Sequence, residues 1–105
     1  MPHAIAKIQD TVIAETDKWE TVEGNIYFPH SSLKNSAGTF SLTESATSTF
    51  CPWKGTASYY DIVVQATGAV IPDAVWYYPE PYEAAQNIKD HVAFYKSKVD
   101  VVVEN

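Results

Sequence analysis

The chain is 105 residues long and 46% hydrophobic, which is enough for one domain spanning residues 1–105 and too little for a second core. It carries 13 acidic residues against seven lysines and no arginine, and the resulting net charge of −6 repels nucleic-acid backbones and anionic lipid headgroups. We therefore expect neither nucleic acid nor a membrane as a partner, while the oligomeric state stays open.

The first third of the chain predicts strands in hairpin order. Short β-prone runs alternate with polar turns, at residues 4–8, 11–15, 19–23 and 26–28. Pro29 ends the fourth strand because proline lacks a backbone N–H, and residues 31–34 predict one short helical turn.

The middle of the chain predicts further strands around a polar loop. Residues 39–43 favour a strand, whereas residues 44–48 are small and polar without any period, which indicates an exposed loop. Residues 49–51 are extended, and residues 52–55 turn. The run at 56–64 is the longest β-prone stretch and predicts a central strand.

The next segment is divided by glycine and proline. Residues 65–68 and 72–73 predict loop structure before a strand at 74–78. Residues 79–81, Pro-Glu-Pro, then predict a rigid extended exit.

One helix is expected near the C-terminus, from about Tyr82 to Asp90. Ala84, Ala85 and Ile88 fall on one face of it at helical spacing. Strands at 92–95 and 99–103 follow, so the chain reads as mainly β, with one C-terminal helix and a short helical turn.

The stretch from Cys51 to Tyr60 sets a thiol, an indole, an ammonium and two phenols around a proline-glycine turn. Four motifs occur in order along the chain: Tyr27-Phe28-Pro29, Cys51 to Tyr60, Trp76 to Pro81, and His91 to Tyr95. In this the sequence resembles a family of small proteins known as a domain of unknown function and labelled nucleotidyltransferase-like. The resemblance implies a small tent-like arrangement of two antiparallel sheets with one helix alongside.

The single cysteine bears on three expectations: metal binding, cofactor binding and cellular compartment. Some tent-like domains hold zinc with cysteine pairs, but Cys51 is the only cysteine here, so no metal site and no cofactor are predicted. Without a disulfide or a signal-peptide pattern, the expected compartment is the cytosol.

The nucleotidyltransferase label has little support among the residues. That chemistry uses paired carboxylates to hold divalent metal between phosphates. The sequence has no Asp-x-Asp, Asp-x-Glu or P-loop pattern, and Asp61 and Asp73 are isolated from each other along the chain. We therefore expect no nucleotidyl transfer.

Three side chains are candidates for catalysis, and each also has a structural interpretation. Cys51 is either a nucleophile whose thiolate is favoured by Lys54 or His91, or a small buried hydrophobe. Lys54 and Gly55 form either an anion site or a solvated turn. His91 either moves protons near neutral pH or caps the last carbonyls of the helix.

The aromatic residues either form core or line a pocket for a planar ligand. Neighbours on a strand point to opposite faces, so Tyr59 and Tyr60 cannot pack against the same surface, and neither can Tyr77 and Tyr78. Some of these rings need a second surface, which a pocket would supply.

The leading hypothesis is a small-molecule binding domain for a small anionic or aromatic ligand, with Lys54 as the anion anchor. Its predicted pocket comprises Tyr27, Trp53, Lys54, Gly55, Tyr59, Trp76 and Tyr78. One alternative is a small cytosolic enzyme that uses Cys51 or Lys54 with His91 as base. Another is an interaction module that presents tryptophan and tyrosine side chains to a protein partner.

Overall fold

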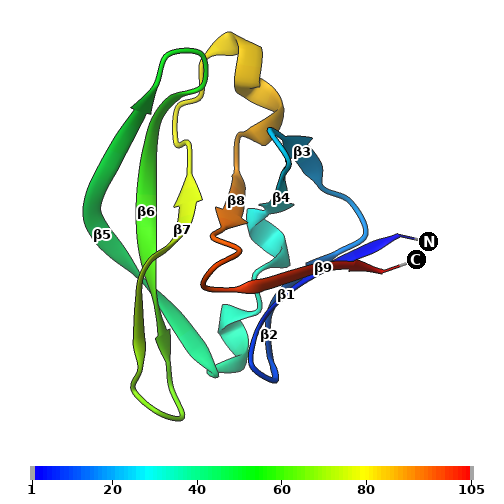
Figure 1. Ribbon diagram of the computed structural model, residues 1–105, viewed down its shortest axis with the longest axis vertical. Helices are drawn as coiled ribbons and strands as arrows, with labels where there is room; N and C mark the ends of the chain where they lie inside the picture. Colours follow the sequence, from blue (N-terminus) through cyan, green and yellow to red (C-terminus); the bar gives the residue numbers. More distant parts are fainter. Residues whose placement is uncertain (1, 105) are drawn as a thin grey trace.

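In the computed structural model, which describes residues 2–104, the strands form two antiparallel sheets (Figure 1). The smaller sheet has the strand order β2-β1-β9 and the larger has the order β3-β4-β8-β7-β6-β5. Both the predominance of β structure and the two antiparallel sheets are as predicted. Within the described residues, no helix has the length and apolar character needed to cross a membrane.

The elements follow one another with short connections. The smaller sheet contains β1 (His3–Ile8), β2 (Thr11–Thr16) and β9 (Asp100–Glu104). The larger sheet contains β3 (Glu20–Val22), β4 (Asn25–Pro29), β5 (Phe40–Cys51), β6 (Gly55–Val64), β7 (Val70–Tyr77) and β8 (His91–Phe94). Three short 3-10 helices also occur in the described chain: η1 (His30–Ser32), η2 (Asn35–Ala37) and η3 (Glu83–Ile88).

Tight turns set the register of the N-terminal hairpins. Gln9 has a φ of 53° in the turn between β1 and β2. In the turn between β3 and β4, Glu23 and Gly24 have φ values of 54° and 78°, and Val22 pairs directly with Asn25. Two positive φ values in a two-residue connection define a type I′ turn, whose twist matches that of the flanking strands. Glu23 is an unusual residue at such a position, where Asn, Asp and Gly are preferred.

Two segments predicted as loops belong to strands. Residues 44–48 lie within β5, which is irregular there, because Glu44 pairs with Tyr60 and Ser48 with Ser58. Pro72 and Asp73 lie within β7, whose register against β6 shifts at the same level. Both segments are bulges that sequence periodicity cannot distinguish from loops, since bulged residues leave the alternation of a strand.

Side chains bridge these two bulges. The hydroxyl of Ser45 donates to the carboxylate of Asp73, and the hydroxyl of Thr47 donates to the same carboxylate at 2.8 Å. These two bonds lower the pKa of Asp73. The backbone N–H of Asp73 in turn donates to Asp61 Oδ1 at 2.8 Å. The polar residues of the predicted loop therefore tie β5 to β7 across β6.

The predicted C-terminal α-helix is a 3-10 helix instead. Within η3, Ala85 departs from helical geometry with a φ of −123°, and its N–H donates to the carbonyl of Tyr82 at 2.8 Å. The two buried residues, Ala85 and Ile88, are three positions apart, which is the repeat of a 3-10 helix. Ala84, expected on the buried face, is exposed. The predicted turn at 31–34 corresponds to η1.

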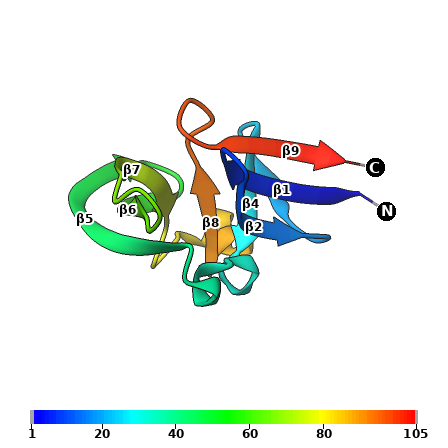
Figure 2. The same cartoon turned by 90° about the horizontal axis from the view of Figure 1, so that it is seen from below.

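The first hydrophobic core lies where the two sheets face each other (Figure 2). Figure 2 also shows β5 curving around β6 and β7, on the side of the larger sheet away from β1. The rings of Phe28 and Phe94 meet edge to face in this core, with centroids 5.3 Å apart. Its other members include Ala4, Ala6, Ile13, Ala14, Ile62, Val75, Val92 and Val99.

A second core occupies the opposite face of the larger sheet. Alternation along the strands separates the two: Phe28 and Val75 face the first core, and their neighbours Tyr27 and Trp76 face the second. We call the second core the aromatic cluster. It comprises Tyr27, Ala57, Tyr59, Trp76, Tyr78, Ala85, Ile88 and Ala93.

Candidate functional site

The paired tyrosines divide between the two cores as the strand period requires. Tyr59 and Tyr78 belong to the aromatic cluster, whereas Tyr60 and Tyr77 pack against the first core and stack on each other with centroids 4.6 Å apart. The prediction that neighbours face opposite surfaces is confirmed. The aromatic cluster lies on the face of the larger sheet opposite the first core, and its outer side is open to solvent.

A pocket of about 350 Å³ lies over the aromatic cluster. Its aromatic wall comes from β6, β7 and the residues that directly follow β7 and β8, and consists of Tyr59, Trp76, Tyr78 and Tyr95. Its polar wall consists of Asn25, Lys54 and Lys96. Four of these residues, Lys54, Tyr59, Trp76 and Tyr78, are predicted pocket residues, and the structure brings them together.

Tyr27 lies beneath the pocket and supports its floor. The ring of Tyr27 is 1% exposed and meets that of Trp76 edge to face, with centroids 6.2 Å apart. The indole N–H of Trp76 donates to the Tyr27 phenol oxygen at 3.0 Å. Tyr27 therefore orients Trp76 from below. It does not line the pocket, although the sequence predicted that it would.

Lys54 is buried and paired. Its side chain is 9% exposed, and its ammonium donates to the carboxylate of Glu23 in the β3–β4 turn. The same nitrogen lies 5.4 Å from the ring centroids of both Trp53 and Tyr78, within range of a cation–π interaction. Burial opposes the charge, but the bond to Glu23 and the nearby phenols outweigh it and raise the pKa of Lys54 to about 12.

This raised pKa determines what Lys54 can do. A lysine that acts as a nucleophile or a base needs a neutral amine, hence a lowered pKa near the working pH. Lys54 is a permanent cation, and Glu23 already compensates its charge. The geometry suits electrostatic and structural work, and it does not suit an amine nucleophile.

Comparison with known proteins adds one finding to this geometry. Over residues 2–105 the sequence matches a family described as a domain of unknown function, DUF427. The chain belongs to the DUF427 family. A search of curated proteins gives no match.

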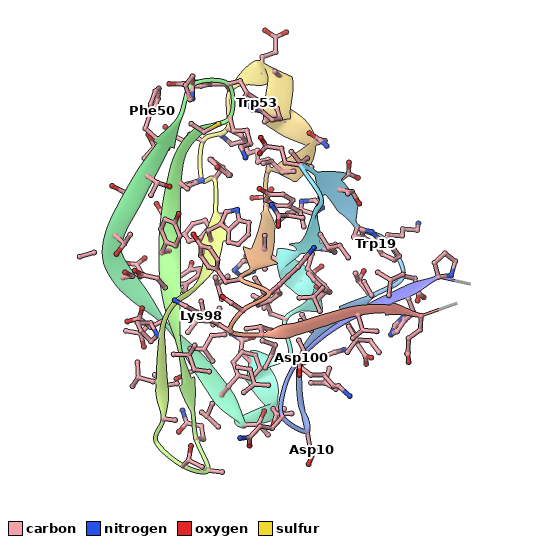
Figure 3. All side chains as sticks on the ribbon, in the orientation of Figure 1. Asp10, Trp19, Phe50, Trp53, Lys98 and Asp100 are labelled. Carbon is pink, nitrogen blue, oxygen red and sulfur yellow. The ribbon has the colours of Figure 1, made fainter. Side chains whose placement is uncertain are left out.

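Two other predicted pocket residues of this DUF427 domain lie beside the pocket and not in its wall. Trp53 is 41% exposed in the turn between β5 and β6, at the end of the molecule that also carries Phe50 (Figure 3). Gly55 has a φ of 115°, and a Cβ atom there would lie 3.3 Å from the carbonyl oxygen of Glu80. Glycine thus lets the segment after β7 cross the turn, where the Tyr82 N–H donates to the Lys54 carbonyl at 2.9 Å.

His91 does not line the pocket. It opens β8 and pairs with Pro29 of β4, whereas the pocket residue Tyr95 follows the other end of β8. Its Nδ1 lies 2.7 Å from the carbonyl oxygen of Lys89, the residue that ends η3. This contact is the one that the capping interpretation expects.

Cys51 is half-buried at the edge of the aromatic cluster. It pairs with Gly55 across the β5–β6 turn and packs against the aromatic cluster, as Val22 does, outside the pocket wall. These contacts match its interpretation as a small hydrophobe.

Sequence reasoning missed two polar residues of the pocket and left Tyr95 out of it. Lys96 and Tyr95 follow β8, and Asn25 begins β4, so two elements distant in sequence must come together before these residues meet. A usable signal existed for Tyr95, which is the last residue of the His91-to-Tyr95 motif. Lys96 has no such signal, because a lysine after a strand reads as an ordinary solvated residue.

The phenols around the pocket stay protonated at neutral pH. The neighbouring Tyr59 hydroxyl and burial raise the pKa of Tyr95 to about 12. Burial also raises the pKa of Tyr78 and of Tyr27, against the opposing effects of Lys54 and Trp76. The hydroxyls of Tyr78 and Tyr95 can therefore donate hydrogen bonds, and they are not bases.

A second hollow of about 490 Å³ lies outside the aromatic cluster, lined by Thr56, Ser58, Pro79, Glu80 and Tyr82. Among the described residues, no cationic side chain and only one aromatic ring, that of Tyr82, line this second hollow. In the part of the chain that the structure describes, no group of three or more His, Cys, Asp or Glu side chains is placed to hold a metal ion.

Proposed function

We propose that this DUF427 domain binds a small organic molecule in the pocket over the aromatic cluster, with lysine charge attracting an anionic group. The observation that carries the proposal is convergence: four rings and two lysines from β6, β7, the β5–β6 turn and the segments after β7 and β8 line one concavity. Apolar walls with a few placed polar groups are the usual composition of ligand sites. The volume of about 350 Å³ favours a ligand of one or two rings.

The pocket favours binding over nucleotidyl transfer. Asp61 and Asp73 do lie together, but the carboxylate of Asp73 is occupied by Ser45 and Thr47, and neither aspartate lines the pocket. A cavity at the small end of the range also leaves little room for a nucleoside triphosphate. Both observations weigh against the activity that the family label suggests.

Exposed rings at one end of the molecule favour a second candidate, a protein-interaction module. Phe50 is 64% exposed and Tyr82 47%, and their rings meet edge to face with centroids 6.5 Å apart, near Trp53. Such exposed aromatic residues are enriched in protein interfaces. This surface is distinct from the pocket, so the two candidates can be tested separately.

The test compares two exposed tyrosines. A compound library is screened by thermal shift and ligand-observed NMR, and each hit is repeated on Tyr95→Ala and on the matched control Tyr82→Ala. We expect hits to be lost in Tyr95→Ala and kept in Tyr82→Ala, since only Tyr95 lines the pocket. A ligand at a hundred times its Kd raises the free energy of unfolding by about 2.7 kcal/mol, well within reach of the assay.

Two results would overturn the proposal. One is a library in which no compound class stabilises the protein. The other is a set of hits that Tyr95→Ala leaves intact, and hits lost in Tyr82→Ala instead would move the site to the exposed rings.

A further inference from the structure

The lysine charge of the pocket is not shared equally between its two lysines. Among residues 2–104, the ion pairs within 4.0 Å join His3 to Glu15 and Asp17, and Lys54 to Glu23. Lys96 belongs to none of them. Its ammonium donates to the backbone carbonyl of Gly24 at 3.0 Å, which uses one of its three donors and none of its charge.

The two lysines therefore act differently on an incoming anion. Lys54 and Glu23 form a pair with no net charge, and an anion would have to displace a carboxylate that is already in place. Lys96 is exposed at the pocket wall, with a full positive charge and two donors directed to nothing else among the described residues. Of the two lysines that line the pocket, Lys96 is the one whose charge is not already compensated by a carboxylate.

The remaining polar groups of the wall can each donate a hydrogen bond. The phenols of Tyr78 and Tyr95 keep their protons at neutral pH, and the amide of Asn25 can donate or accept. A carboxylate, which only accepts hydrogen bonds, can therefore be bound by any of them beside the Lys96 ammonium.

Resting on the proposed binding function, we propose that the ligand is an aromatic carboxylate, a planar ring with a single negative charge, and that Lys96 is the residue that binds its carboxylate. Lys54 is then a positioning residue, which holds the β3–β4 turn and Tyr78 in place through Glu23. This assignment differs from the sequence expectation, in which Lys54 is the anchor.

The planar ring follows from how the wall rings are arranged. Trp76 and Tyr95 approach each other with centroids 4.7 Å apart, and Tyr95 lies parallel to Tyr59 with centroids 6.4 Å apart. Tyr95 is 38% exposed, so part of this stacked group remains open beside Lys96, the next residue along the chain. A flat ring can extend the stack while a substituent reaches the ammonium.

The single charge follows from charge balance. A phosphate monoester approaches two negative charges at neutral pH, and one lysine compensates only one of them. The sequence holds no arginine to form a bidentate clamp, and the net charge of −6 makes any uncompensated negative charge costly. A monoanion is the charge that Lys96 alone can satisfy.

The experiment measures Kd by NMR titration for matched probes: benzoate and indole-2-carboxylate, their neutral carboxamides, phenyl phosphate, and cyclohexanecarboxylate. On the unmodified protein we expect the aromatic carboxylates to bind best, with the amides, the phosphate and the aliphatic acid each weaker by about tenfold or more. Lys96→Met should reduce carboxylate affinity by about tenfold and leave amide affinity unchanged.

Two control variants separate Lys96 from the other lysines. Lys98→Met removes a lysine of the same segment that donates to the Pro72 carbonyl at 2.6 Å and lies 5.4 Å from the Tyr95 ring centroid without lining the pocket, and it should leave the preference for carboxylate over amide unchanged. The double variant Glu23→Gln/Lys54→Met removes the ion pair as a neutral unit; since Lys54 lines the pocket, the variant should weaken the binding of acids and amides alike and keep the preference for the carboxylate over the amide. Circular dichroism checks that each variant is folded, which the exposure of Lys96 leads us to expect.

The outcomes distinguish this inference from the proposed function. If amides bind as well as acids, or if Lys98→Met and Lys96→Met weaken binding equally, the inference is wrong while small-molecule binding stands. Loss of the preference for carboxylate over amide only in the double variant would return the anchor to Lys54. If none of the probes binds but library hits depend on Tyr95, the ligand class is wrong. If nothing binds at all, both proposals fail.

Discussion

A hydrogen bond between distant parts of the chain holds the indole of Trp76 in place. Tyr27 lies on β4 and Trp76 on β7, 49 positions apart, and the Trp76 N–H donates to the Tyr27 oxygen at 3.0 Å. The two side chains are 1% and 9% exposed, so water cannot replace either partner freely. Buried polar groups are nearly always paired, and this pair fixes the floor of the pocket.

We predict that Tyr27→Phe lowers the free energy of unfolding by about 1–3 kcal/mol, because the indole N–H stays buried without its acceptor. The ring and its packing are retained, so the effect isolates the hydroxyl. Urea denaturation followed by tryptophan fluorescence measures it. The control is Tyr82→Phe, at a tyrosine that is 47% exposed, where we expect a change within about 0.5 kcal/mol. Equal effects of the two substitutions would contradict the assigned bond.

At the scale of elements, the β1–β2 hairpin is closed at its open end by His3. One ring nitrogen lies 2.5 Å from Asp17 Oδ1 and the other 3.0 Å from Glu15 Oε2, and Glu104 of β9 is its cross-strand neighbour. The bond to Glu15, and then that to Asp17, raises the pKa of His3 above its ordinary 6.5. The charged ring is thus the form that these carboxylates favour.

The direction of the pH effect follows from this shift. A group whose pKa is raised on folding contributes its stability in full below the unfolded-state value, about 6.5 for histidine, and loses it as the pH rises through the folded-state value. We predict that the melting temperature of the protein exceeds that of His3→Gln at about pH 5.5 and that the difference shrinks toward about pH 8.5. Differential scanning calorimetry at the two pH values measures this.

The matched control replaces the exposed His30 by glutamine. Its melting temperature should follow that of the unmodified protein at both pH values. A difference for His3→Gln that stays constant with pH would show that the carboxylate contacts do not discriminate between the two forms of the ring.

The elements also show what the sequence could and could not predict. Hairpin turns and paired tyrosines were predictable, because a turn residue and a period of two are local signals. The bulges at residues 44–48 and 72–73 were not, since they are held by Ser45 and Thr47 on the carboxylate of Asp73, contacts that span 28 and 26 residues. The helix was given the wrong period because spacings of three and four look alike over so few residues.

The candidate site also contains features that the sequence predicts and features that it does not. Its rings were predictable from composition and alternation, but its charges were not. Glu23 and Lys54 are 31 positions apart, and only the fold shows that the one neutralises the other. Lys96 becomes part of the pocket only because β8 runs beside β4 and β7 in the larger sheet.

At the scale of the whole molecule, the two cores share one sheet. Strands β4, β7 and β8 send alternate residues to the first core and to the aromatic cluster, so the two cores depend on the same strands. Loss of packing on one face removes support for the strands that form the other. The domain should therefore unfold as one cooperative unit, as expected for a single small domain.

Two isoleucines test this, one in each core. Ile13 on β2 belongs to the first core and Ile88 on η3 to the aromatic cluster, and both are 0% exposed. We predict that Ile13→Ala and Ile88→Ala each lower the free energy of unfolding by about 2–5 kcal/mol. Fluorotryptophan NMR follows both faces at once, since Trp19 packs against the first core and Trp76 lies in the second.

In either variant the signals of Trp19 and Trp76 should lose intensity at the same urea concentration, because both report one transition. A separate, earlier transition of Trp19 in Ile13→Ala would mean that the three-stranded sheet unfolds alone and that the chain is two cooperative units. Shared strands argue against that result: β1, β2 and β9 bury their apolar face only against the larger sheet, and the larger sheet cannot keep its first face buried once they leave.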